Sequence, residues 1–197
     1  GHETTSLALS WTYYLLSQHP DVERNIADEV DRVIGDGKPA FAHVDRLTFT
    51  RRALEESLRL YPPAWGFSRL ALGDDENGGY RVPKGSIAYL IPFVVHRRPK
   101  LWPDPERFDP DRFAPERESV RHRFAYIPFG GGPRGCIGHQ FAMLEAQLIV
   151  AAIARRYRIE LVPDQKIRPE PLITLHPKPG IRAGIAKRAA RPPSLVR

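Results

Sequence analysis

The stretch that decides the fold of this chain is glycine-rich and reads Phe129-Gly130-Gly131-Gly132-Pro133-Arg134-Gly135-Cys136-Ile137-Gly138. Glycine adopts backbone angles that other residues avoid, so the loop can bend until its N–H groups approach the sulfur of the only cysteine. A helix is expected after the loop and up to about Arg156, because apolar residues recur at helical spacing. They are Ile137, Phe141, Leu144 and Leu148. The cysteine should therefore lie just before a helix N-terminus, which favours negative charge.

Cys136 has the surroundings of a metal ligand. Only the thiolate form of cysteine binds metal, and Arg134 adds positive charge two residues away. A lone cysteine is nevertheless more often a small buried hydrophobe, and glycine-rich turns before helices are common. Taken alone, the residues of the loop leave both interpretations open.

At every fixed position this loop resembles the cysteine-ligand loop of the cytochrome P-450 family, the haem-thiolate monooxygenases. The resemblance implies that Cys136 is the axial ligand of the iron in haem b, with Phe129 and Gly138 beside the cofactor. A thiolate ligand pushes electron density onto the iron and favours cleavage of the O–O bond.

The resemblance also implies cationic contacts to the two haem propionates. Arginine is suited to binding carboxylates, and the resemblance points to Arg134 and Arg69. His96 is a weaker candidate, equally well explained as a structural histidine with satisfied ring nitrogens.

Glu56 and Arg59 stand three residues apart on one face of a predicted helix. Such pairs are mostly surface decoration, but here the pair resembles the family's Glu-x-x-Arg motif. In the family an arginine from a downstream Pro-x-Arg-Phe segment joins the pair. Arg112 is our choice for that position, with Arg107 as the runner-up, and the network is expected to fix the core beneath the cysteine loop.

Residues 1–5 resemble the C-terminal part of the family's oxygen-activation motif. The resemblance implies that Thr4 holds a hydrogen bond near the bound oxygen and that Glu3 feeds it protons. From these five residues alone, an ordinary helix start with an exposed glutamate is the simpler interpretation. An acid–alcohol pair argues for monooxygenation.

Two apolar turns resemble the family's substrate-pocket segments. They contain Trp65 and Phe67 after the Glu-x-x-Arg helix, and Ile173 in a C-terminal hairpin. They favour a lipophilic substrate, although core packing explains apolar residues equally well.

Composition limits the classes of partner. The chain has 197 residues, a net charge of +7 and a mean hydropathy of −0.40, as expected for a globular domain. Its basic residues are scattered among acids, which argues against nucleic acid as a partner. A solvated surface is the default interpretation of each basic cluster, and a docking face for an acidic redox protein is the sharper alternative. No apolar run approaches about 20 residues and no signal peptide is visible, so we expect no membrane segment and a cytoplasmic location.

The expected fold class is mainly α with a small β part: the C-terminal half of the cytochrome P-450 fold, from the distal oxygen-activation helix through the cysteine loop and the helix after it. The N-terminal half of that fold is expected to be absent. Residues 1–186 should form this partial haem domain, and 187–197 a disordered, basic, proline-containing tail. Predicted helices span residues 1–18, 21–34 with Asp21 as N-cap, and 50–61; strand-like segments span 65–95 and 159–185.

The resemblance implies an enzyme that inserts one oxygen atom of O₂ into a lipophilic substrate. Electrons would come from NAD(P)H through a ferredoxin, a flavodoxin or a flavin reductase. Three alternatives remain: a truncated cytochrome P-450 fragment with an incomplete pocket and weak or no haem binding, a peroxide-using or rearranging haem-thiolate enzyme, and, remotely, a basic nucleic-acid-binding module.

Overall fold

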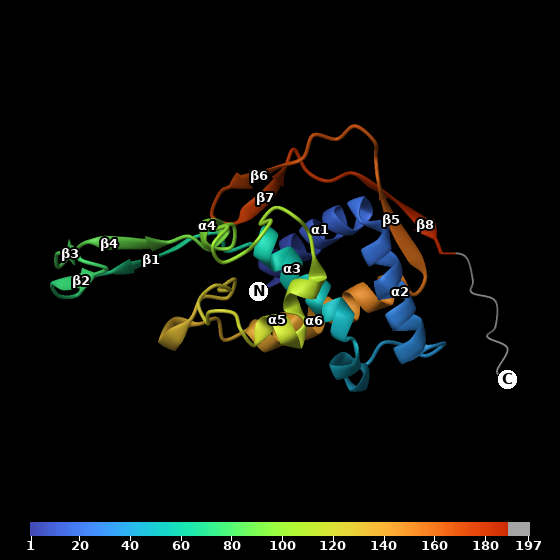
Figure 1. Ribbon diagram of the computed structural model, residues 1–197. Helices are drawn as coiled ribbons and strands as arrows, with labels where there is room; N and C mark the ends of the chain where they lie inside the picture. The colour runs from blue at the N-terminus through green and yellow to red at the C-terminus, as the bar shows by residue number, and fades with distance from the viewer. Residues whose placement is uncertain (189–197) are drawn as a thin grey trace.

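Four long helices form the body of the protein, and the computed structural model describes residues 1–188 (Figure 1). These helices are α1 (His2–Gln18), α2 (Pro20–Ile34), α3 (Thr48–Leu60) and α6 (His139–Ala154). Short helices α4 (Pro92–Val95) and α5 (Pro115–Glu118) and three 3₁₀ turns, Phe41–Arg46, Pro110–Phe113 and Gly132–Arg134, lie in the connections. The described part is thus mainly helical, as predicted.

The core lies where the four long helices meet. Each of these helices contacts the other three, and their buried side chains form one apolar cluster that includes Ile26, Leu54 and Val150. Burial of this apolar surface is the main force holding the helices together. It also fixes the N-terminus of α1 and the start of α6, the two ends that approach the cysteine loop.

The apolar residues that predicted helix α6 do not form its buried face. The buried residues of α6 are Met143, Ala146, Gln147, Val150 and Ala151. By contrast, Ile137 is fully exposed, Phe141 is 67% exposed, and Leu144 and Leu148 are only half-buried. Helix α6 is apolar on nearly every side, so periodicity could not show which face packs against the core.

Two helix starts also differ from the prediction. Helix α2 begins at Pro20 with His19 as N-cap, so Asp21 lies in the first turn, because proline fixes the backbone angle of a first helical residue. Helix α3 begins at Thr48, where the buried Glu29 carboxylate of α2 accepts bonds from the N–H groups of Phe49 (2.7 Å) and Thr50 (2.8 Å). This carboxylate from another helix provides the cap that the local sequence lacks.

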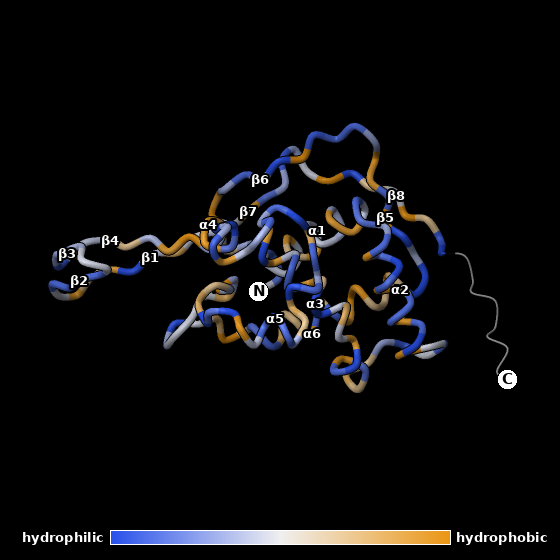
Figure 2. The backbone as a smooth tube through the Cα atoms, viewed as in Figure 1, coloured by the Kyte–Doolittle hydropathy of each residue, from blue (hydrophilic) through white to orange (hydrophobic). Residues whose placement is uncertain are grey.

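The strands form four two-stranded antiparallel sheets. Strand β1 (Phe67–Leu70) pairs with β4 (Ile87–Leu90), and β2 (Asp75–Asn77) pairs with β3 (Tyr80–Val82); together they form an arm projecting from the helical body (Figure 1). Its far end is largely hydrophilic (Figure 2). Gly78 and Gly79 both have positive φ, as a two-residue hairpin turn requires.

The C-terminal strands confirm the predicted hairpin region. Strand β5 (Tyr157–Leu161) pairs with β8 (Ala183–Lys187), and β6 (Arg168–Pro171) pairs with β7 (Leu175–Lys178). The predicted tail begins too early, because Lys187 ends β8 and Arg188 donates to the Arg156 carbonyl (2.8 Å). The rest of the tail, 189–197, lies outside the described residues. No described helix is both long enough and apolar enough to span a membrane.

Candidate functional site

The cysteine loop borders a cavity of about 620 Å³. Its walls come from the start of α1, from α3, from β1 and from the loop and first turns of α6. The lining includes these residues that the sequence predicted for the site: Thr4, Phe67, Arg69, Phe129, Arg134, Cys136 and Gly138. A cavity of this size and mixed lining is typical of a small-molecule or cofactor site.

Cys136 is exposed in this cavity and is held by a tight turn. Its N–H donates to the Phe129 carbonyl (2.9 Å), and Gly130 takes a φ of 71°, which suits glycine. The sulfur lies 3.8 Å from where a Cβ on Gly138 would stand. Within residues 1–188 no N–H donates to the sulfur, so the expected amide contacts are not made in this structure. Helix α6 begins at His139, just after the loop, as predicted.

Phe129 lines the cavity beside the cysteine and packs against the helical core. Its ring stacks on the ring of His139, with centroids 4.1 Å apart. Burial lowers the pKa of His139. The sequence reasoning did not single out His139, and its place directly after the loop was the available signal.

Arg69 and Arg134 supply the cationic part of the cavity. Both line it, and in the described part of the chain neither guanidinium forms an ion pair. Arg69 lies on β1 with its guanidinium 5.0 Å from the Phe67 ring centroid. Two unpaired cations in one cavity suit a ligand that carries carboxylates.

His96 lies outside the cavity and is completely buried. Its Nε2 accepts from the N–H of Ile127 (2.9 Å), and its Nδ1 lies 3.1 Å from the Arg59 carbonyl. Burial lowers the pKa of His96 to about 3, so the ring is neutral and Nδ1–H donates to that carbonyl. His96 is therefore a structural histidine whose two ring nitrogens are both satisfied, and it does not line the cavity.

Glu56, Arg59 and Arg112 lie together in the structure. The Glu56 carboxylate accepts from Arg59 Nε (2.6 Å) and Nη2 (2.8 Å), and both side chains are 0% exposed. Arg112 Nε stands 3.3 Å from Glu56 Oε1, whereas the side chain of Arg107 points to solvent. The structure therefore brings Arg112, and not Arg107, to the pair.

The Arg59 guanidinium also binds three backbone carbonyls, those of His96 (2.8 Å), Pro105 (2.7 Å) and Arg107 (3.1 Å). Burial raises the pKa of the Glu56 carboxyl, and the hydrogen bonds from Arg59 oppose that rise. Through His96 the network reaches Ile127, two residues before Phe129. It thus ties the end of α3 to the entry of the cysteine loop.

Glu3 and Thr4 face different surroundings. Thr4 lines the cavity, and its hydroxyl lies 3.5 Å from the Gly1 carbonyl. Glu3 does not line the cavity; it accepts a hydrogen bond from Thr174 Oγ1 (2.7 Å), with His176 Nε2 at 3.5 Å. Sequence reasoning missed Thr174 and His176 as partners of Glu3, and no local signal marks them.

Of the proposed substrate residues only Phe67 lines the cavity. Trp65 Nε1 instead donates to the Leu172 carbonyl (2.8 Å), which joins the two predicted pocket turns to each other. Ile173, at the tip of the β6–β7 turn, is 97% exposed and lies outside the cavity.

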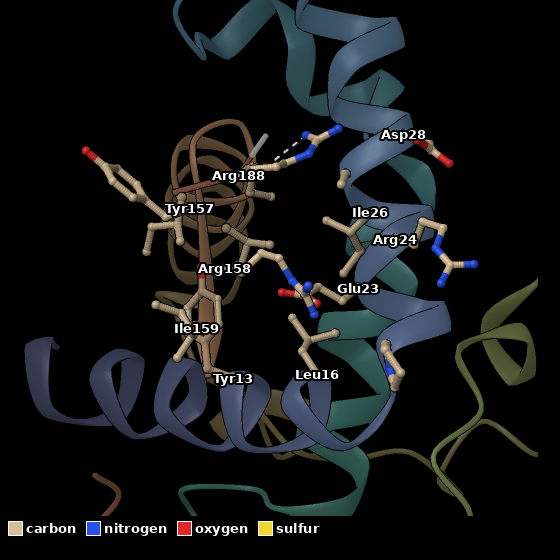
Figure 3. A pocket seen from close by; sticks show the side chains of 15 residues that line it. Tyr13, Leu16, Glu23, Arg24, Ile26, Asp28, Tyr157, Arg158, Ile159 and Arg188 are labelled. Carbon is tan, nitrogen blue, oxygen red and sulfur yellow. Dashed lines mark hydrogen bonds and ion pairs between the residues drawn. The ribbon is translucent and has the colours of Figure 1, made fainter. Parts of the chain in front are cut away.

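A second cavity of about 200 Å³ lies between α1, α2, α6 and β5 (Figure 3). Leu16, Ile26 and Ile159 line it, and the Glu23–Arg158 ion pair (3.1 Å) stands at its edge. The Tyr13 hydroxyl is buried without a partner in the described part of the chain, and burial raises the pKa of Tyr13. Among the described residues that line this cavity there is no thiol and no imidazole.

The residues around the cavity beside Cys136 fit a metal ion that is already held by a macrocycle, and not a bare metal ion. Residues 1–188 contain no group of three or more His, Cys, Asp and Glu side chains that could hold a bare metal ion. Cys136 offers one thiol, the walls are largely apolar, and Arg69 and Arg134 can bind peripheral carboxylates. This donor set would fit haem, in which the porphyrin nitrogens supply the other ligands of the iron.

Comparisons with known proteins agree with this geometry. The family model described as cytochrome P-450 matches residues 1–182. Cyclooctatin synthase of Streptomyces melanosporofaciens is 48% identical over 175 residues, which are 89% of this chain and 38% of that protein. Cyclooctat-9-en-7-ol 5-monooxygenase of the same organism is 42% identical, over 83% of this chain and 36% of its own length.

Comparison with solved structures also finds similarity to cytochrome P-450 proteins. The haem domain of cytochrome P-450DA superimposes with a TM-score of 0.90 at 37% identity, over 95% of this chain and 42% of that domain. The chain thus spans about two fifths of the length of the relatives that it matches.

Proposed function

Because the chain belongs to the cytochrome P-450 family, we propose that it forms the cysteine-ligand and oxygen-activating part of a haem-thiolate monooxygenase. The observation that carries the proposal is the shared cavity of about 620 Å³, lined by both the Cys136 thiol and Thr4. Cys136 can bind iron, and Thr4 can direct a proton within the same cavity.

Haem b would supply redox-active iron for the activation of O₂. Cys136 would hold the iron, and the exposed guanidinium groups of Arg69 and Arg134 would bind the carboxylates of the cofactor. Phe129 lines the same cavity as Cys136 and would add apolar surface beside the cofactor.

Thr4 lines the cavity, and its hydroxyl can hold or pass on a proton there. The apolar lining, including Phe67, favours a lipophilic substrate. In support, one relative is named for monooxygenation of cyclooctat-9-en-7-ol.

Electrons would reach the site from NAD(P)H through a ferredoxin, a flavodoxin or a flavin reductase. The net charge of +7 favours an acidic protein partner, because opposite charges accelerate encounter.

A specific observation favours weak retention of haem by this chain alone. Phe141 lines the cavity and is still 67% exposed, and the neighbouring Ile137 is fully exposed. Apolar side chains left open to water indicate that the cavity wall is incomplete in residues 1–188.

The experiment is a haem titration of the chain, followed by turnover with NADPH, a ferredoxin and its reductase. We expect haem to bind with weak affinity, reaching at most one haem per chain at saturation, and product formation that depends on NADPH. Thr4→Val should then lower product formed per NADPH by about 10²-fold, the scale of a lost proton transfer, while Thr4→Ser retains coupling. Turnover with hydrogen peroxide only would contradict the monooxygenase proposal and favour the peroxide-using alternative.

A further inference from the structure

Glu3, at the start of α1, is held by two side chains of the β6–β7 hairpin. Thr174 Oγ1 donates to Glu3 Oε1 at 2.7 Å. His176 Nε2 lies 3.0 Å from Thr174 Oγ1 and 3.5 Å from the same Glu3 oxygen. Thr174 is 171 positions away from Glu3, so the tertiary fold alone makes this contact.

The hairpin turn that carries Thr174 is anchored on both sides. Before it, the Leu172 carbonyl accepts from Trp65 Nε1 (2.8 Å). After it, the buried Leu175 carbonyl accepts from Trp11 Nε1 (3.0 Å). A hydroxyl held between two anchored residues offers the carboxylate a fixed partner, which costs less conformational entropy than a mobile one.

The contact with Thr174 affects both the pKa of the Glu3 carboxyl and the direction in which the Glu3 side chain points. Donation from Thr174 is the main reason that the pKa of Glu3 lies below its usual value, and His176 adds to the effect. Neighbouring residues on a helix point about 100° apart, so Glu3 faces β7 while Thr4 faces the cavity. Glu3 can carry a proton into the cavity only by turning away from Thr174.

We propose that Thr174 and His176 are positioning residues that hold the Glu3 carboxylate against β7 and away from the cavity. Glu3 then exchanges a proton with the cavity only after it leaves them. The delivery step rests on the proposed function, whereas the holding contact does not.

The other charged groups near the contact are few. His2 precedes Glu3 on α1 and interacts with its carboxylate at longer range. Glu170 stands opposite His176 in the β6–β7 register, and it pairs with Lys178 on β7. Because Lys178 already pairs with Glu170, His176 is the hairpin side chain that remains to contact Glu3.

The test is an NMR titration of the Glu3 side chain in the chain without cofactor. Thr174→Val keeps the shape of the side chain and removes the donor, so the pKa of Glu3 should rise by about half a unit to one unit. Thr174→Ser should restore the original value. Ser6→Ala is the matched control, because the Ser6 hydroxyl donates to the Glu3 backbone carbonyl (2.8 Å) and not to its carboxylate.

An unchanged Glu3 titration in Thr174→Val, with the amide spectrum of the fold intact, would overturn the proposal. The Glu3 titration needs neither bound haem nor turnover. Its result therefore tests the holding contact separately from the proposed function.

Discussion

Substitution Glu56→Ala should destabilise the protein far more than loss of a surface charge. The carboxylate is completely buried and binds two nitrogens of Arg59, the Asp109 N–H (2.9 Å) and, at 3.3 Å, Arg112. Removing one partner of a buried pair costs about 3–5 kcal/mol, because the other charge is left uncompensated. Arg59 keeps three carbonyl acceptors, which places the expected cost near the lower end, about 3 kcal/mol.

The assay is urea unfolding followed by circular dichroism. With an m value of about 2 kcal/mol/M, the midpoint should fall by about 1.5 M urea at unchanged m. The control is Arg81→Ala, which breaks the exposed Arg81–Asp74 pair (3.5 Å) and should cost less than about 1 kcal/mol. If Glu56→Ala and Arg81→Ala cost the same, the network would not hold the core. If Arg107→Ala lowered the free energy of unfolding more than Arg112→Ala, the assignment of Arg112 to the network of Glu56 and Arg59 would be refuted.

The pKa of the buried His96 is about 3 in the fold against a usual 6.5, so its contribution to stability is present above about pH 6.5 and lost as pH falls toward 3. Unfolding measured at about pH 7 and about pH 5 should differ by about 2 kcal/mol from this group, and His96→Asn should remove that difference. Gly130→Ala places a Cβ at a φ of 71° and should cost about 1–2 kcal/mol in thermal unfolding, whereas Gly73→Ala, with open space and no positive φ, should cost almost nothing. Arg69→Gln and Arg134→Gln should each weaken haem binding about tenfold in a fluorescence-quenching titration, and unchanged affinity would show that neither cation binds the cofactor.

The sequence motifs located the site because their information is local. The cysteine loop and the Glu56–Arg59 spacing each specify a turn or a helix face within a few residues. The structure brings Cys136 to a cavity and joins Arg112 to the pair, as the resemblance implied.

The remaining features depend on contacts between distant segments. The direction of Glu3 is set by Thr174 on a hairpin at the other end of the chain, and no local pattern encodes that contact. Burial of His96 follows from packing on Tyr126 and Trp102. The exposed face of α6 could not be recognised because a helix apolar on most sides gives no preferred direction.

The most direct test of the account is the absorption spectrum of the haem-loaded chain after reduction and addition of carbon monoxide. Cys136 is the only thiol of the chain, so the account predicts the red-shifted Soret band of a thiolate-ligated carbonyl complex. Cys136→Ser should abolish that band, and Cys136→His should replace it with the band of an imidazole-ligated complex. A thiolate-type band that survives both substitutions, or wild-type chain that takes up haem without showing it, would contradict the assignment of Cys136 as the iron ligand.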